Sequence, residues 1–324
     1  MPKFLIIRFS SIGDIVLTTP VIRCLKKQVK DAEVHFLTKK SFAEIIEHNP
    51  YIDKKIYFDN NLSQTIQTLK LSNYDYIIDL HHNLRTFLIK LRLMKKSFSF
   101  NKLNFEKWLM VNFKINRLPN SHIVDRYLET VKSFGVINDG EGLDYFLPCD
   151  INPNFDLPEK YIAFVIGAKH YTKKLPVEKI ISIIRKINQP VVLVGGREDT
   201  KSGEQIKSEI RNPKSEIINS CGQCSITQSA SIIKNASAVI THDTGMMHIA
   251  AAFKKKIISI WGNTIPEFGM QPYYGNEIPN LKFEIRNLKC RPCTKIGFDK
   301  CPKGHFKCMM EINELEIAKA ASEI

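Results

Sequence analysis

One stretch, residues 237–253, carries polar residues at a spacing suited to holding a phosphate group. A short apolar run typical of a buried strand opens it, and an alanine-rich run that favours a helix closes it. A turn with a capping side chain and a glycine joins them, and a histidine follows one helical turn later. These residues are Asp243, Thr244, Gly245 and His248. The N–H groups at such a helix start point toward an anion, so the stretch predicts a donor-binding site.

The same stretch also fits an ordinary capped helix after a strand. Asp243 or Thr244 would then serve only as the cap, and His248 could either contact a nucleotide or fill the helix face. The prediction of a site therefore depends on other parts of the chain.

Asp14 is the candidate for acid–base chemistry. Residues 3–9 form an apolar strand, residues 10–14 a polar turn, and residues 14–27 have helical apolar spacing with Pro20 near the start. A carboxylate at the end of a strand can take a proton from a hydroxyl group, although a helix cap is the simpler interpretation.

Further cations and polar loops follow other predicted strands. Lys173 and Lys174 are adjacent, and one sequence does not separate their roles. Arg85 follows a strand and could meet an anionic acceptor, and residues 195–199 form a glycine-rich loop. The carboxyl ends of parallel strands lie at one edge of a sheet, so we expect these loops to converge on a ligand.

Four cysteines cluster near the end of the chain, with spacings that a tetrahedral zinc site could use. They are Cys290, Cys293, Cys301 and Cys308. These four cysteines could either hold a structural metal ion or remain plain thiols.

Strands and helices alternate through most of the chain, which predicts parallel α/β sheets. We predict a Rossmann-like domain over residues 1–150, a second over residues 151–310, and a C-terminal helix over residues 311–324 that packs back on the body. The two domains are expected to face a central cleft.

The chain has 324 residues and a formal net charge of +14, with 44% hydrophobic residues. Its apolar runs fall far short of the roughly 20 residues that cross a bilayer, and no signal peptide is visible, so a cytoplasmic location is expected. The positive charge favours anionic partners such as nucleotides or an acidic membrane face. No long basic block or RNA-binding aromatic motif is present, which disfavours a nucleic-acid partner.

Four segments together resemble glycosyltransferase family 9, the lipopolysaccharide heptosyltransferases. They are residues 8–20 (RFSSIGDIVLTTP), 172–176 (TKKLP), 242–248 (HDTGMMH) and the cysteine-containing tail 290–308. The resemblance covers nearly the whole chain with the motifs in the family's order.

The resemblance implies a GT-B fold, a nucleotide-sugar donor such as ADP-heptose, inversion at the anomeric carbon and no catalytic metal. The family's base falls on Asp14, beside Ser10 and Ser11, which with Arg85 are candidates for acceptor binding. The family's phosphate-binding lysine falls on Lys173, with Leu175 in place of a tryptophan. Its aspartate-threonine-glycine motif, which holds sugar hydroxyls and the diphosphate, falls on Asp243, Thr244 and Gly245.

The leading hypothesis is therefore an inverting, metal-independent transferase that moves a heptose or related sugar onto a lipopolysaccharide inner-core acceptor. It would act in the cytoplasm, with peripheral contact at the inner face of the inner membrane. No cofactor is needed for catalysis, and zinc would be structural. The alternatives are a sugar-nucleotide epimerase or hydrolase on the same scaffold and a basic nucleic-acid-binding protein with a cysteine cluster.

Overall fold

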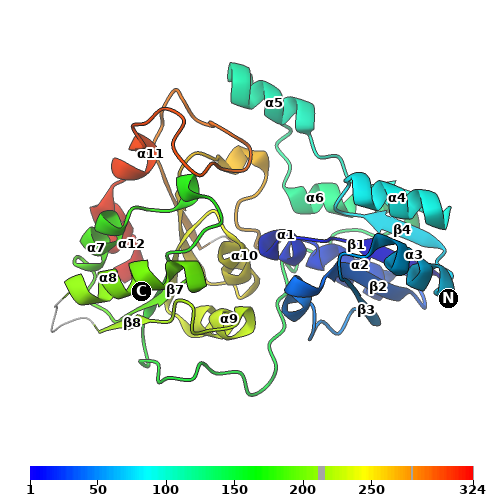
Figure 1. The fold of residues 1–324 in the computed structure, drawn as a ribbon, viewed down its shortest axis with the longest axis horizontal. Helices are drawn as coiled ribbons and strands as arrows, with labels where there is room; N and C mark the ends of the chain where they lie inside the picture. Colours follow the sequence, from blue (N-terminus) through cyan, green and yellow to red (C-terminus); the bar gives the residue numbers. More distant parts are fainter. Residues whose placement is uncertain (211–215, 279, 324) are drawn as a thin grey trace. The chain divides into compact units, whose positions relative to one another are not determined.

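The computed structural model describes residues 1–210, 216–278 and 280–323 (Figure 1). The chain forms two compact units. The first contains residues 1–102, 121–148 and 273–277, and the second contains the described parts of residues 103–120, 149–272 and 278–324. The chain passes into the main part of the second unit after Pro148, next to the predicted domain boundary at residue 150. The segments 103–120 and 273–277 each belong to the unit opposite to the one that the prediction gave them.

The first unit is built on a parallel sheet with the strand order β3-β2-β1-β4-β5. Its strands are β1 (Lys3–Ile7), β2 (Glu33–Lys39), β3 (Lys54–Phe58), β4 (Tyr76–Asp79) and β5 (Lys96–Ser99). Its helices are α1 (Ile12–Val16), α2 (Thr19–Gln28), α3 (Leu62–Leu71), α4 (Leu84–Leu93) and α6 (Ile123–Leu128), with the 3₁₀ turns η1 (Lys40–Ile45) and η2 (Lys132–Phe134). The central strand β1 is the most apolar, and four of its five residues are buried.

The single helix expected over residues 14–27 is two helices. Leu17 and Thr18 form a turn between α1 and α2, and Pro20 lies in the first turn of α2. Proline lacks an N–H group and is tolerated there, because the first N–H groups of a helix have no intrahelical partner. The break separates the short helix that carries Asp14 from the long helix that packs in the core.

The second unit is built on a parallel sheet with the strand order β11-β10-β9-β6-β7-β8. Its strands are β6 (Ile162–Val165), β7 (Val191–Val194), β8 (Ile217–Asn219), β9 (Ala238–His242), β10 (Lys256–Trp261) and β11 (Leu281–Ile285). Its helices are α5 (Asn104–Phe113), α7 (Val177–Ile184), α8 (Thr200–Glu209), α9 (Ile226–Asn235), α10 (Gly245–Ala252), α11 (Lys307–Met310) and α12 (Glu314–Ser322), with the 3₁₀ turns η3 (Tyr171–Lys173), η4 (Arg197–Asp199) and η5 (Pro266–Phe268).

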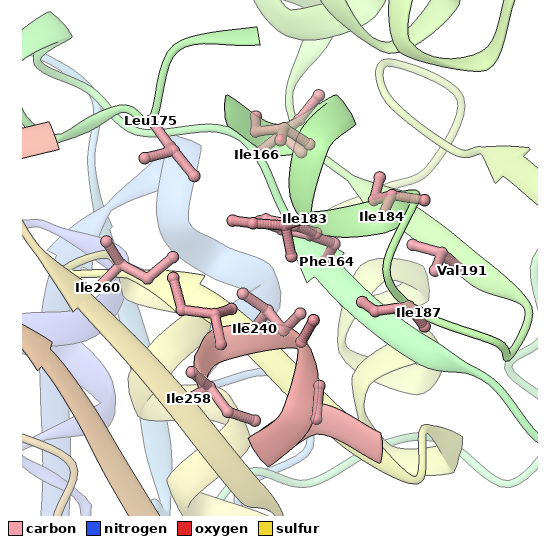
Figure 2. Close-up of a cluster of buried hydrophobic side chains, with 14 of the residues drawn as sticks. Phe164, Ile166, Leu175, Ile183, Ile184, Ile187, Val191, Ile240, Ile258 and Ile260 are labelled. Atoms are coloured by element: carbon pink, nitrogen blue, oxygen red, sulfur yellow. The ribbon is translucent and has the colours of Figure 1, made fainter. Parts of the chain in front are cut away.

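The core of the second unit lies between its sheet and the helices α7 and α12 (Figure 2). Phe164 and Ile240 come from neighbouring strands, and Ile183 comes from α7. The C-terminal helix closes this core with Ile317, which is fully buried, and Glu314 at its start accepts a hydrogen bond from Lys179 of α7 at 2.8 Å. Residue 324, the last of the predicted C-terminal segment, lies outside the described residues.

Two parallel sheets with helices in sequence alternation confirm the prediction of two Rossmann-like units. The apolar runs of β6, β7 and the first three residues of β9 are typical of strands buried on both faces. Among the described helices, none combines the length and the apolar character that a membrane span requires.

Candidate active site

In the first unit, Asp14 lies in α1, directly after the loop that follows β1. Its Oδ2 atom accepts a hydrogen bond from the Ser11 hydroxyl at 2.8 Å and from the Ser11 backbone N–H at 3.2 Å. Ser11 is the N-cap of α1, so the carboxylate belongs to a capping box. The N-cap is therefore Ser11 and not Asp14, and the hydrogen bonds of the capping box fix the position of the Asp14 carboxylate.

Arg8 holds the other carboxylate oxygen of Asp14. Its Nη2 atom lies 2.7 Å from Asp14 Oδ1, and its Nη1 atom donates to the Leu80 carbonyl and to the Tyr127 hydroxyl, the latter at 3.0 Å. The Nε atom donates to the Ser10 carbonyl at 2.7 Å. A single buried guanidinium thus joins the ends of β1 and β4, helix α6 and the candidate base.

The surroundings keep Asp14 ionised. Burial alone would raise its pKa, but the charge of Arg8 and the hydrogen bonds from Ser11 outweigh burial, so the pKa of Asp14 lies below its ordinary value. Burial and the charge of Arg8 also lower the pKa of His81 to about 4, and its ring packs against Phe9. His81 is therefore neutral near pH 7, and Asp14 is the anion of this loop.

The other predicted acceptor residues lie close in sequence to this loop or at the next strand end. Ser11 contacts Asp14 directly, whereas Ser10 contributes its carbonyl to Arg8. Arg85 is exposed in the first turn of α4, and its guanidinium lies 5.6 Å from the centre of the Phe58 ring. This exposed cation in α4, the helix that follows β4, remains a candidate for binding an anionic acceptor group.

In the second unit, β9 leads through the turn 243–244 into α10, as the sequence predicts. Thr244 is the N-cap in extended conformation, yet its side chain makes no capping hydrogen bond to the helix. The N–H groups of the first turn, starting at Gly245, are therefore not satisfied by that side chain. A helix start of this kind attracts an anion.

Lys173 brings a cation to this helix start. Its Nζ atom lies 2.6 Å from Asp243 Oδ2 and 3.3 Å from the Asp243 carbonyl oxygen. The Thr264 hydroxyl donates to the same carboxylate oxygen at 2.8 Å. Asp243 thus fixes the ammonium group of Lys173 beside the turn, and the two motifs of the sequence prediction meet here.

Lys174 has a different partner from its neighbour. Its Nζ atom lies 2.5 Å from Asp199 Oδ1, in the glycine-rich loop that follows β7. The second oxygen of Asp199 accepts from the Gly196 N–H at 3.0 Å, and a Cβ atom on Gly167 would lie 2.3 Å from it. The structure therefore separates the adjacent lysines: Lys173 belongs to the turn before α10 and Lys174 braces the glycine-rich loop.

His242, the last residue of β9, binds the loop that carries Lys173 and Lys174. It is fully buried, and its Nε2 atom accepts the backbone N–H of Leu175 at 3.0 Å. Leu175, which stands where the family has a tryptophan, is 3% exposed and belongs to the hydrophobic core (Figure 2). The loop is thus anchored by one buried hydrogen bond and one buried apolar side chain, directly after Lys173 and Lys174.

We expect His242 to make the fold sensitive to acid. Burial and the charge of Lys174 lower its pKa to about 3, from an ordinary value of 6.5. Between these values the unfolded chain binds a proton that the folded chain does not, so stability falls as pH falls. Each pH unit within this window removes about 1.4 kcal/mol for this group, and above it the contribution is constant. Urea unfolding over a pH series measures the slope.

The matched variant is His242→Gln, whose amide oxygen can still accept the Leu175 N–H but does not titrate. Its stability should depend less steeply on pH in the same window. Equal slopes for the two proteins would contradict the role of His242.

A second stability prediction concerns Leu175. Truncation to alanine leaves a cavity in the core and should lower the free energy of unfolding of the second unit by about 2–5 kcal/mol. Leu175→Met conserves volume and should cost less than about 1.5 kcal/mol. Trp108 and Trp261 both belong to the second unit, so tryptophan fluorescence in urea follows this unit selectively. Similar losses for the two variants would exclude the cavity explanation.

His248 lies in α10 and is 2% exposed. Of the two roles left open for it, burial favours packing within the unit over contact with a nucleotide. The residues that the sequence prediction missed are Arg8 and Thr264, which hold Asp14 and Asp243. Arg8 had a sequence signal, since a charge within an apolar strand-like run must find a buried partner.

The four cysteines lie in the second unit, and Cys308 is buried in its core. Cys290 Sγ is 3.9 Å from His305 Nε2, and Cys293 Sγ lies 3.1 Å from the Cys290 carbonyl oxygen. Within the described part of the chain, no three His, Cys, Asp or Glu residues are grouped so that they could hold a metal ion.

The sequence of this chain matches a family model and known proteins. The sequence model of glycosyltransferase family 9 (heptosyltransferase) matches residues 62–297. Lipopolysaccharide heptosyltransferase 1 of Campylobacter coli is 25% identical over 349 residues, covering 99% of this chain and 98% of that protein. The residues that the family model matches make up more than two thirds of the chain.

Two solved structures have a similar fold. The family 9 glycosyl transferase of Veillonella parvula DSM 2008 superposes with a TM-score of 0.78 at 21% identity, covering 99% of this chain and 96% of that one. The E. coli ADP-heptose lps heptosyltransferase II superposes with a TM-score of 0.71 at 17% identity, covering 98% of each chain. The likeness confirms the predicted GT-B class of two Rossmann-like units.

Proposed function

Because this chain belongs to glycosyltransferase family 9, the heptosyltransferase family, we propose that it transfers a heptose from ADP-heptose to an inner-core sugar of lipopolysaccharide. The observation that carries the proposal is the ammonium group of Lys173, held 2.6 Å from Asp243 at the start of α10. A fixed cation beside a helix start is suited to a diphosphate. The donor is suggested by the E. coli relative, an ADP-heptose enzyme that acts on lipopolysaccharide.

On the donor side, the bond between the anomeric carbon and the diphosphate oxygen breaks, and the leaving nucleotide gains negative charge. Lys173 and the N–H groups that begin at Gly245 would stabilise this charge more in the transition state than in the ground state. Thr264 and Asp243 keep the ammonium in place, so little reorganisation is needed when charge develops. Asp243 would also be available to sugar hydroxyls, as the family resemblance implies.

On the acceptor side, a hydroxyl oxygen attacks the anomeric carbon from the face opposite the leaving group, which inverts the configuration. Asp14 takes the hydroxyl proton as the new bond forms. The lowered pKa of Asp14 keeps it ionised at neutral pH and makes it a modest base, suited to a proton that becomes acidic only as the oxygen attacks. Ser10, Ser11 and Arg85 are proposed to contact the acceptor.

We propose that the reaction needs no metal, because Lys173 and the helix start supply the positive charge that a divalent cation would otherwise provide. Structural zinc at Cys290, Cys293, Cys301 and Cys308 stays a prediction. Metal analysis of the purified protein and transfer in the presence of a chelator test these two points separately.

The proposed location is the cytoplasm, with the chain acting at the inner face of the inner membrane on a lipid-linked acceptor. The net charge of +14 supports attraction to an anionic surface. The same charge would also attract nucleic acid, but the sequence has no long basic block or RNA-binding aromatic motif.

The test is calorimetry against a panel of nucleotide sugars, followed by transfer assays with an inner-core acceptor freed of its fatty acids. We expect ADP-heptose to bind most tightly and product to form only when acceptor is present. Consumption of donor without acceptor would favour an epimerase or hydrolase. Salt-sensitive retention on nucleic acid without nucleotide-sugar binding would favour a basic nucleic-acid-binding protein.

A further inference from the structure

Helix α4 exposes an apolar stripe to solvent. Four large apolar side chains at the helical spacing i, i+3, i+7 and i+10 are more than half exposed: Leu84 (73%), Phe87 (54%), Leu91 (57%) and Met94 (85%), the last being the C-cap. The stripe extends over about 15 Å at the rise of an α-helix. We call these four residues the outer stripe.

The outer stripe is not the face that α4 uses to fold. Thr86, Ile89 and Leu93 are the buried residues of the helix, and the latter two pack into the core of the first unit. Helix α4 also packs beside α3 in that unit. A surface helix with a second apolar face beyond the one that it buries has more apolar surface than folding explains.

Positive charge lies beside the outer stripe. Residues 80–102 contain six lysines and arginines and no aspartate or glutamate: Arg85, Lys90, Arg92, Lys95, Lys96 and Lys102. Lys90 is paired with Asp79 at 2.9 Å. Arg92, Lys95 and Lys96 are exposed, and helical geometry places Arg85 and Arg92 along one border of the stripe. The apolar surface therefore has cations along one border and directly after its last residue.

The apolar side chains and the neighbouring cations together determine which partner fits the outer stripe. A second copy of the chain seated stripe to stripe would bring two clusters of positive charge together, which is unfavourable. Nucleic acid would match the cations but would leave the aliphatic side chains against phosphates and water. An anionic bilayer satisfies both, since lipid phosphates meet the cations and the apolar side chains enter the boundary between headgroups and acyl chains.

We propose that the outer stripe of α4 is the surface by which this protein docks on an anionic phospholipid membrane. The inference deepens the proposed function, because it rests on an acceptor that is anchored in a bilayer. Docking through one face of the first unit, which carries Asp14, would keep this enzyme at the surface where such an acceptor is presented.

The experiment is co-sedimentation of the full chain with vesicles of phosphatidylcholine alone and of phosphatidylcholine with about one third phosphatidylglycerol. We expect binding to the anionic vesicles, weakened by added salt. The double variant Phe87→Ser/Leu91→Ser should bind them at least about tenfold more weakly. The triple variant Arg92→Gln/Lys95→Gln/Lys96→Gln should lose about ten- to a hundredfold on anionic vesicles, with neutral vesicles unaffected.

The matched control is Phe105→Ser/Trp108→Ser on α5. These two stacked rings are also at least half exposed, but that helix has Glu106 beside them. This variant should bind vesicles like the wild type. Unchanged binding by both α4 variants, loss of binding in the α5 variant alone, or no binding by the wild type would overturn the proposal. A wild-type dimer that Phe87→Ser/Leu91→Ser turns into a monomer, with vesicle binding retained, would also overturn it.

Transfer to the acceptor freed of fatty acids separates this inference from the proposed function. The α4 variants should transfer heptose to it at the wild-type rate and lose rate only with acceptor in anionic vesicles. Wild-type protein that binds vesicles but transfers to neither acceptor would overturn the proposed function and leave docking intact. If the apolar double variant fails to fold, vesicle binding by the triple charge variant tests the proposal alone, because that variant changes exposed residues only.

Discussion

Replacing Asp14 by asparagine is expected to lower the turnover number for heptose transfer by roughly 10²–10⁴-fold, the usual contribution of a general base. Donor affinity should stay near the wild-type value, because the proposed phosphate-binding residues, Lys173 and Gly245, belong to the other unit. Asparagine can still accept the hydrogen bonds from Ser11, so the cap of α1 and the loop should persist. Steady-state transfer kinetics and calorimetry with ADP measure the two quantities.

A matched control removes a carboxylate from another buried arginine of the same unit. Asp139 pairs with Arg23 at 2.8 Å, and Asp139→Asn should cost stability without abolishing transfer. The lowered pKa of Asp14 adds a pH test. Since a base must be ionised, the turnover number should stay constant through neutral pH and fall only as pH drops through that lowered pKa. An Asp14→Asn enzyme that turns over at the wild-type rate would remove Asp14 from the mechanism.

The second large effect is expected at Lys173. Lys173→Ala removes the cation beside the start of α10 and should lower kcat/KM by roughly 10²–10³-fold, as loss of one fixed donor to a developing charge does elsewhere. Affinity for ADP should fall as well, because the diphosphate is present in the product. Fluorescence or calorimetric titration with ADP, beside transfer kinetics, separates ground-state binding from the rate effect.

Lys174→Ala is the control for this prediction. Lys174 has the same charge and the adjacent position, but its ammonium pairs with Asp199. We expect its loss to affect stability and the glycine-rich loop more than the chemical step. If the Lys174 variant loses more activity than the Lys173 variant, the assignment of the two lysines is reversed.

Much of the alternation of elements was predictable because most strands contain a short apolar run bounded by turn residues. Strand β5, with the sequence KSFS, has no such signal. Buried parallel strands such as β6, β7 and β9 need apolar side chains on both faces, and that pattern is visible in one dimension. The helix break before α2 was visible only as Pro20, which is compatible with either a kink or a fresh start. Its outcome depends on packing that the sequence does not show.

Residue types could indicate the site but not its pairings. Lys173 and Lys174 are equivalent in sequence, and only their partners, Asp243 and Asp199, distinguish them. Arg8 was part of a motif, yet its role depends on Leu80 and Tyr127, which are distant in sequence. Long-range partners of a buried charge are set by the strand order and cannot be deduced from local spacing.

Both units are completed by segments from elsewhere in the chain. In the first, Asn138 donates to the hydroxyl of Tyr273 at 2.6 Å, a residue of the segment 273–277. In the second, Lys114 of the segment 103–120 donates to the Pro292 carbonyl at 2.7 Å. The polypeptide therefore crosses from one unit to the other after residues 102, 120, 148, 272 and 277.

This interleaving constrains protein engineering. A fragment truncated at residue 148, or a hybrid with another family member spliced there, would separate each insert from the body that it stabilises. Such products should aggregate or be degraded, whereas hybrids that transplant the two inserts together with their own bodies should remain intact. Acceptor and donor preferences can thus be recombined only by exchanging discontinuous blocks of the gene.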